Sequence, residues 1–193
     1  MKVLLRISGL IDGLSTVIGK AIIWLILASV LLSTGNALAR KIFSVGSNAF
    51  TEMQWYLYGA VFLLGAGYAF LKNAHVRIDF VSSHLSPKTR SVIDIIGILF
   101  VLTPLCLFIL DLSWPLFMNA FISKEMSSNA GGLIRWPVYL LLPTGMILLL
   151  LQSLSELVKR IAFLKGMIPD PIAHKTDSGE PAASQTELSR EEC

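Results

Sequence analysis

The sequence predicts an all-α integral membrane protein with four transmembrane helices and both termini in the cytoplasm. Three observations support this prediction: the composition, four long apolar runs, and the uneven distribution of Lys and Arg. Of the 193 residues, 54% are hydrophobic and 15% are charged, and the mean hydropathy is +0.68. A soluble domain carries about 25% charged residues, and one soluble core cannot enclose four long apolar runs in a chain of this length.

A helix that crosses a bilayer needs about 20 mostly apolar residues. Four segments meet this requirement, residues 17–39, 53–71, 91–112 and 136–155. The first carries one charge, Lys20, near its start, and the second and fourth carry none. The third has only 16 residues between Asp94 and Asp111. The sequence therefore leaves open whether this third helix is long and tilted or is broken near Pro115.

The predicted membrane domain, residues 17–168, lies between two different terminal segments. Residues 1–16 place Leu4, Ile7 and Leu14 on one helical face. They form either a cytoplasmic amphipathic helix on the inner membrane surface or an extension of the first span. Residues 169–193 contain Pro, Ser, Ala, Glu and Thr but few large apolar residues. We expect them to form a disordered cytoplasmic tail.

The orientation follows from Lys and Arg, which are enriched in cytoplasmic loops. Twelve of these residues lie before or at the start of the first span, between the second and third, or after the fourth, and four lie in the other connections. The side with twelve should be cytoplasmic. The formal net charge of +3 arises from these flanking residues and predicts no nucleic-acid partner.

The predicted spans lack the groups that chemistry or transport inside a bilayer requires. All three histidines fall outside the spans, which excludes a bis-histidine haem site. Four carboxylates fall near predicted span ends: Glu52, Asp94, Asp111 and Glu156. The sequence contains no glycine-rich phosphate loop, no metal-spaced Cys/His set and no nucleophile motif. We therefore expect neither an enzyme nor a resident cofactor or metal.

The second span carries small residues at helical spacing, Gly59, Gly65, Ala66 and Ala69. Small residues let membrane helices approach closely. They provide either a docking face for a partner helix or packing among the chain's own helices, and taken alone they favour packing within the chain.

Polar residues cluster at the span ends. Asn36 and Arg40 share a helix face at the outer end of the first span, and Glu52 precedes the second. An Arg40–Glu52 ion pair would join the two spans; the alternative is two solvated charges at headgroup level. The alternating residues His75, Arg77 and Asp79 follow the second span. They are too few for a metal site and suit either a partner contact or a loop among phospholipid headgroups.

Several of these segments resemble the small membrane subunit of TRAP transporters, the tripartite ATP-independent periplasmic transporters of bacteria and archaea. The main similarity lies in residues 52–68, which begin Glu52-Met-Gln-Trp55, and continues into residues 73–79. Asn36 and Arg40 match the end of the family's first helix. Further matching segments are residues 91–94, 125–137 and 142–145. The resemblance covers about residues 15–162.

The resemblance implies a non-catalytic subunit of the bacterial inner membrane. In this family a periplasmic binding protein captures an organic acid or related polar solute, and a large membrane subunit of about a dozen helices performs sodium-coupled transport. The small subunit docks beside the large one and offers part of the platform for the binding protein. The implied partner-contact residues are Asn36, Arg40, Glu52, Trp55, Gly59, Gly65, Ala66, Ala69, His75, Arg77 and Asp79.

The residues leave one alternative open: a stand-alone four-helix membrane protein, either a structural factor or an unrelated small exporter. An exporter needs a titratable group at mid-depth, which the predicted spans lack.

Overall fold

The computed structural model describes residues 2–44, 46–72 and 86–168 of the chain. These residues form long helices joined by short connections, which confirms the all-α prediction for the described part. The elements are α1 (Lys2–Phe43), α2 (Asn48–Leu71), α4 (Pro87–Gly97), the π-helical segment η1 (Ile98–Leu102), α5 (Thr103–Ser123) and α6 (Trp136–Leu164). The tail from residue 169 and the candidate residues His75, Arg77 and Asp79 lie outside the described residues.

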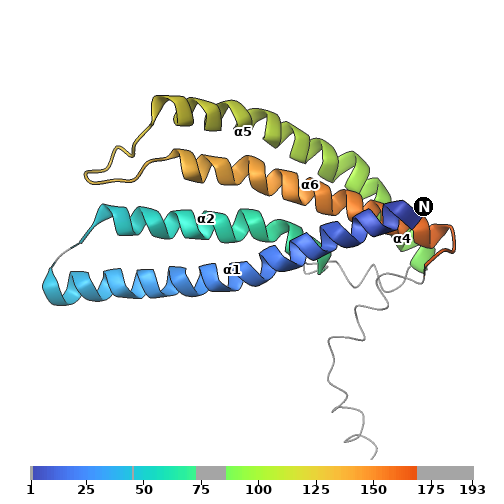
Figure 1. The fold of residues 1–193 in the computed structure, drawn as a ribbon, viewed down its shortest axis with the longest axis horizontal. Helices are drawn as coiled ribbons and strands as arrows, with labels where there is room; N and C mark the ends of the chain where they lie inside the picture. Colours follow the sequence, from blue (N-terminus) through green and yellow to red (C-terminus); the bar gives the residue numbers. More distant parts are fainter. Residues whose placement is uncertain (1, 45, 73–85, 169–193) are drawn as a thin grey trace, which may run out of the picture.

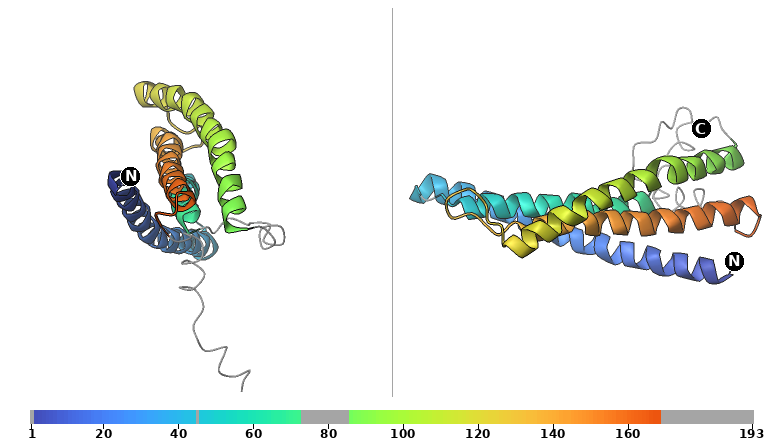
Figure 2. Two further views of the ribbon diagram at one scale, coloured as in Figure 1. Left: turned by 90° about the vertical axis from the view of Figure 1, so that its right-hand side faces the viewer. Right: turned by 90° about the horizontal axis from the view of Figure 1, so that it is seen from above.

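The long helices lie side by side in the order α1, α2, α6, α5 (Figure 1). The α1–α2 connection and the α5–α6 loop meet at one end of the bundle, while the start of α1, α4 and the end of α6 meet at the other. Helix α2 packs on both α1 and α6, whereas α5 packs mainly on α6. Figure 2 shows α5 at the edge of this layer, running diagonally across its neighbours.

Three helical stretches are long and apolar enough to cross a membrane: Val3–Phe43, Pro87–Ser123 and Trp136–Leu164. Helix α2 has 24 residues, a length of about 36 Å. Its tyrosines, tryptophan and glycines add little to the mean hydropathy, so α2 is not among the stretches that are apolar enough by this measure. Three of the four predicted spans therefore lie in helices that are able to cross a membrane, and a span in α2 stays a prediction.

Helix α1 is continuous from Lys2 to Phe43. The N-terminal segment 1–16, over the part that the structure describes, therefore continues directly into the helix of the first predicted span. No turn separates the two in the described residues.

The helix of the third predicted span extends beyond residues 91–112 and is not broken at Pro115, which lies inside α5. The helix instead loosens to π geometry over Ile98–Leu102, which ends two residues before Pro104. Both the Thr103 amide and its hydroxyl donate to the Ile98 carbonyl oxygen, the hydroxyl at 2.8 Å. Pro104 has no N–H and so cannot donate the usual helical bond to the Phe100 carbonyl.

The buried side chains of the bundle are mostly small or polar. Ser29, Ser91, Cys106 and Ala120 are all nearly or fully buried. Large apolar side chains instead point outward, among them Trp24, Phe62 and Phe100. This arrangement suits helices whose large residues face lipid and whose small residues face one another.

Candidate functional site

The small residues of α2 face the neighbouring helices of this chain. A Cβ added at Gly65 would lie 3.4 Å from Ile22 in α1, and one at Gly59 would lie 3.9 Å from Val138 in α6. Ala66 and Ala69 are half-buried. The glycine positions thus act in packing within the chain. Trp55, by contrast, is 70% exposed and points away from the bundle.

Glu52 organises the loop between α5 and α6, residues 124–135. Its carboxylate accepts hydrogen bonds from the Asn129 amide at 2.7 Å, from the backbone N–H of Leu133 at 2.7 Å, and from the Ser127 hydroxyl. Two further side chains of α2 reach the same loop. Asn48 donates to the Ala130 carbonyl at 3.1 Å, and Tyr56 donates to the Ile134 carbonyl at 3.1 Å. The first turns of α2 therefore fix the loop.

The loop also has hydrogen bonds of its own. Lys124 ends α5 in the left-handed conformation, with φ of 50°, a common way to stop a helix. Met126 and Ile134 then form an isolated antiparallel bridge. The Arg135 guanidinium lies 2.8 Å from the Glu125 carboxylate. The bundle therefore presents an ordered loop, rather than a loose connection, at this end.

The pKa values of two charged groups near the loop are shifted in the directions that their hydrogen bonds favour. The pKa of Glu52 is lowered, chiefly by the hydrogen bond from the Leu133 backbone and then by those from Ser127 and Asn129. The pKa of Arg135 is raised, chiefly by its hydrogen bond to Glu125. Both groups are therefore held in their charged forms.

The predicted Arg40–Glu52 ion pair does not form among the described residues, because Glu52 binds the α5–α6 loop instead. The open groove between the ends of α1 and α2 has a volume of about 510 Å³ and is lined in part by Arg40 and Lys41. Beside it, Asn36 donates to the Thr51 hydroxyl at 3.4 Å. Asn36 thus joins α1 to α2, and Arg40 faces an open groove.

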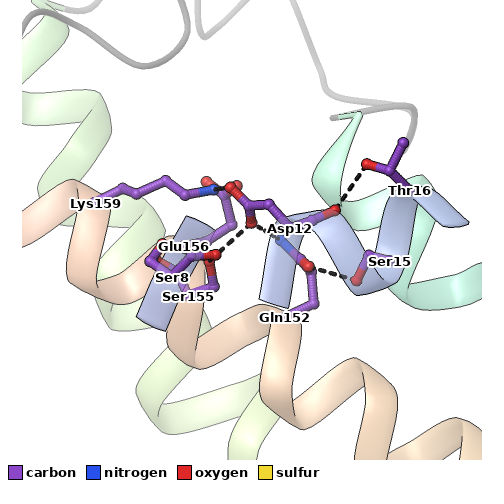
Figure 3. Close-up of polar contacts among 8 residues, drawn as sticks. All are labelled: Ser8, Asp12, Ser15, Thr16, Gln152, Ser155, Glu156 and Lys159. Atoms are coloured by element: carbon purple, nitrogen blue, oxygen red, sulfur yellow. Dashed lines mark hydrogen bonds and ion pairs between the residues drawn. The ribbon is translucent and has the colours of Figure 1, made fainter. Parts of the chain in front are cut away.

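A group of polar residues joins α1 to α6 at the opposite end of the bundle (Figure 3). We call it the α1–α6 polar cluster; its members are Ser8, Asp12, Ser15, Gln152, Ser155, Glu156 and Lys159. The Ser15 hydroxyl donates to Gln152 at 2.6 Å, and the Gln152 amide donates to the Asp12 carboxylate at 3.0 Å. The Lys159 ammonium lies 2.6 Å from Asp12 and 2.9 Å from Glu156. One cation thus bridges two carboxylates.

Arg160 connects the same end of α6 to the start of the third span. Its guanidinium is 3% exposed and lies 2.7 Å from the Asp94 carboxylate in α4. Together with the α1–α6 polar cluster, this pair holds α1, α4 and α6 together by ionic contacts.

Sequence reasoning missed the α1–α6 polar cluster, although a signal was present. Residues 8, 12 and 15 share one helix face, as do residues 152, 155 and 159. Gln152 is a polar residue within the mostly apolar run of the fourth predicted span, residues 136–155. Asp111, which the sequence places near a span end, lies well inside α5, which continues to Ser123.

The described residues contain no group of three or more His, Cys, Asp or Glu side chains placed to hold a metal ion. The acidic side chains at the bundle ends instead bind cations, amides and hydroxyls of the same chain. Fold and contacts together define a small multi-pass membrane protein whose polar groups hold its helices in place.

Comparison with known families shows the family to which this membrane protein belongs. Residues 15–163 match the family described as tripartite ATP-independent periplasmic transporters, DctQ component. The chain belongs to this family, which confirms the resemblance seen in the sequence and makes the chain a transporter component. No curated protein and no solved structure matched the chain.

Proposed function

We propose that this component acts as a non-catalytic scaffold in the bacterial inner membrane. It docks beside the large sodium-coupled membrane subunit and forms part of the platform for the periplasmic solute-binding protein. The complex takes up an organic acid or a related polar solute. The observation that carries this proposal is the match to the DctQ component over residues 15–163.

The arrangement of charge supports a scaffold role. The carboxylates of Asp12, Glu52 and Asp94 each bind groups of their own chain. A side chain that carries a proton or an ion through the bilayer must instead exchange its partner during the cycle. The ionic contacts here join helices, so they suit a rigid support.

The proposed orientation places the α5–α6 loop on the periplasmic side and both termini in the cytoplasm, with α2 as a fourth span. The excess of Lys and Arg at the opposite end supports it. Under this orientation, the loop held by Glu52 offers an ordered surface to the solute-binding protein. Arg40 and Trp55, which lie toward the same end of the bundle, belong to the same proposed contact region.

Cysteine labelling tests this orientation in intact cells. In a Cys193→Ser background, a membrane-impermeant maleimide should label Ser128→Cys in the loop but not Lys165→Cys beyond α6. The buried Cys106 should stay unlabelled in both variants. Labelling of Lys165→Cys, with Ser128→Cys protected, would show that the orientation is reversed.

The direct test of the scaffold proposal is purification of the intact complex. The chain is tagged at its C-terminus, expressed at its native level, extracted in a mild detergent, and its stoichiometric companions are identified by mass spectrometry. We expect one large polypeptide with about a dozen apolar spans. Recovery of the membrane-integrated chain by itself would overturn the proposal.

The inner-loop residues are tested in the same assay. We propose that His75, Arg77 and Asp79 contact the large subunit or lipid headgroups. Arg77→Glu should then lower the yield of the complex. Normal assembly and normal uptake in that variant would exclude this role.

A further inference from the structure

The third span exposes more of its apolar surface than the other two candidate spans. In its most apolar window 11% of the residues are buried, against 22% for α1 and 28% for α6. Large exposed side chains run along η1 and α5: Phe100, Val101, Leu105, Phe108, Leu112 and Leu116. Because α5 packs mainly on α6, the rest of its circumference is open to lipid or to another membrane helix.

An acidic side chain lies in this apolar surface. Asp111 is exposed and lines an open pocket of about 630 Å³ together with Leu107, Trp114 and Ile147. Among the described residues, no hydrogen bond or ion pair reaches the Asp111 carboxylate. It differs in this respect from Asp12, Glu52 and Asp94.

The contacts of α6 give the depth of Asp111 in the bundle. Leu63 lies midway along the uncharged run of α2, residues 53–71. Gly145 of α6 packs on the Leu63 backbone, where an added Cβ would lie 2.8 Å from the carbonyl oxygen. Ile147, two residues further along α6, lines the same pocket as Asp111. Asp111 therefore lies near the middle of the apolar layer and not at its edge, contrary to the expectation that the spans hold no titratable group at mid-depth.

The main chain at the same position also lacks its usual donor. In an α-helix the carbonyl of residue 111 accepts from the N–H of residue 115. Residue 115 is proline, which has no N–H. The position thus presents two kinds of acceptor, a carboxylate and a backbone carbonyl, on one exposed apolar surface.

Exposure of such acceptors to hydrocarbon is costly, and ionisable residues at this depth usually face a partner that supplies a complementary group. We propose that the surface of α5 around Asp111 is where the large membrane subunit docks. One of its transmembrane helices carries an Arg or Lys side chain that pairs with the Asp111 carboxylate. This inference rests on the proposed function and specifies which face of the chain makes the contact.

Charge reversal at Asp111 tests the pairing within the complete complex. Asp111→Lys places two cations opposite each other, so we expect at least a tenfold loss of the large subunit recovered with the tagged chain. The matched control is Phe62→Lys, which puts the same charge on the exposed surface of α2 at a similar depth. We expect this control to keep more than half of the wild-type recovery.

A second measurement leaves Asp111 intact, so it does not depend on how the lysine variant folds. A photoreactive amino acid replaces Phe108, one turn before Asp111 on the exposed surface, or Phe62 on α2. Irradiation should join the large subunit to position 108 and not to position 62. Adducts with lipid alone, or with a second copy of this chain, would overturn the proposal.

The outcomes separate this inference from the proposed function. If the wild-type chain recovers the large subunit and Asp111→Lys recovers it equally well, the docking face is wrong while the scaffold role stands. If the wild-type chain recovers no large subunit, the proposed function fails and this inference fails with it.

Discussion

Gly145 of α6 lies directly against the backbone of Leu63 in α2. A Cβ at residue 145 would lie 2.8 Å from the Leu63 carbonyl oxygen and 2.9 Å from the Leu63 Cβ. Such distances are too short for ordinary contact with main-chain atoms, which cannot rotate away. The absence of a side chain at residue 145 therefore sets how closely the two helices approach.

Gly145→Ala should force α2 and α6 apart. Overpacking of a well-packed contact typically costs about 1–3 kcal/mol, and we expect a loss of that size in the free energy of unfolding in detergent. Thermal unfolding followed by circular dichroism measures it. Gly13→Ala in α1 is the control, since an added Cβ there meets nothing within 4 Å. Equal stability of the two variants would contradict this account of the contact.

Glu52→Gln should loosen the α5–α6 loop. The glutamine amide presents its own N–H groups to the Asn129 and Leu133 donors, which the carboxylate accepts in the wild type. We expect several-fold faster trypsin cleavage at Lys124 and Arg135 in detergent-solubilised protein, because local opening exposes both sites. Gln54→Ala is the control, since Gln54 contacts Tyr58 and not the loop. Unchanged cleavage in Glu52→Gln would show that the loop keeps its order without the carboxylate.

Loop order should also depend on pH through Glu52. The hydrogen bond from the Leu133 backbone, followed by those from Ser127 and Asn129, lowers the pKa of Glu52 below its ordinary value of 4.5. A lowered pKa in the folded state means that the stabilisation is complete above the ordinary pKa. It is lost as the pH falls through the lowered value. Hydrogen exchange at the Leu133 amide, corrected for the intrinsic pH dependence of exchange, should show constant protection from neutral pH to pH 4.5. Protection should then decline.

The Glu52→Gln variant provides the control for this titration. Its residual protection at Leu133 should be independent of pH over the same interval, because the amide does not titrate. A matching decline in the variant would assign the pH dependence to another group.

The helices of this fold were predictable because each span is a long apolar run, and a helix satisfies its own backbone groups in a bilayer. The sequence left open whether the third helix is long or broken near Pro115, and the structure shows a helix that continues past Pro115. A single charge does not end a helix whose backbone bonds continue, and α5 ends only at Lys124, which adopts the left-handed conformation.

The polar contacts between helices were less predictable, because they depend on which helices become neighbours. Asp12 and Gln152 are 140 residues apart in the chain, and the sequence does not say that α1 meets α6. The same limit explains Glu52. Arg40 is a basic residue close to Glu52 in the sequence, across the hairpin, whereas the actual partners of Glu52 lie in a loop at least 75 residues away.

The ion pair between Asp12 and Lys159 offers the clearest test of how α1 is held on α6. The two charged atoms lie 2.6 Å apart, and the side chains are 26% and 14% exposed respectively. Groups in contact within one network usually couple by about 0.5–3 kcal/mol. A double-mutant cycle with Asp12→Asn and Lys159→Met, read from thermal unfolding in detergent, should give a coupling free energy in that range.

The two single variants of this cycle should not be equal. Lys159 lies between two carboxylates, Asp12 at 2.6 Å and Glu156 at 2.9 Å, so Lys159→Met removes the cation that both share and leaves like charges facing each other. Asp12→Asn removes one of the two carboxylates and keeps the Lys159–Glu156 pair. Lys159→Met should therefore destabilise the protein more than Asp12→Asn. Lys165→Met, at an exposed lysine just beyond α6, should change the stability by less than about 0.5 kcal/mol. Equal losses for Lys159→Met and Lys165→Met would mean that the α1–α6 polar cluster contributes nothing measurable to the packing of these helices.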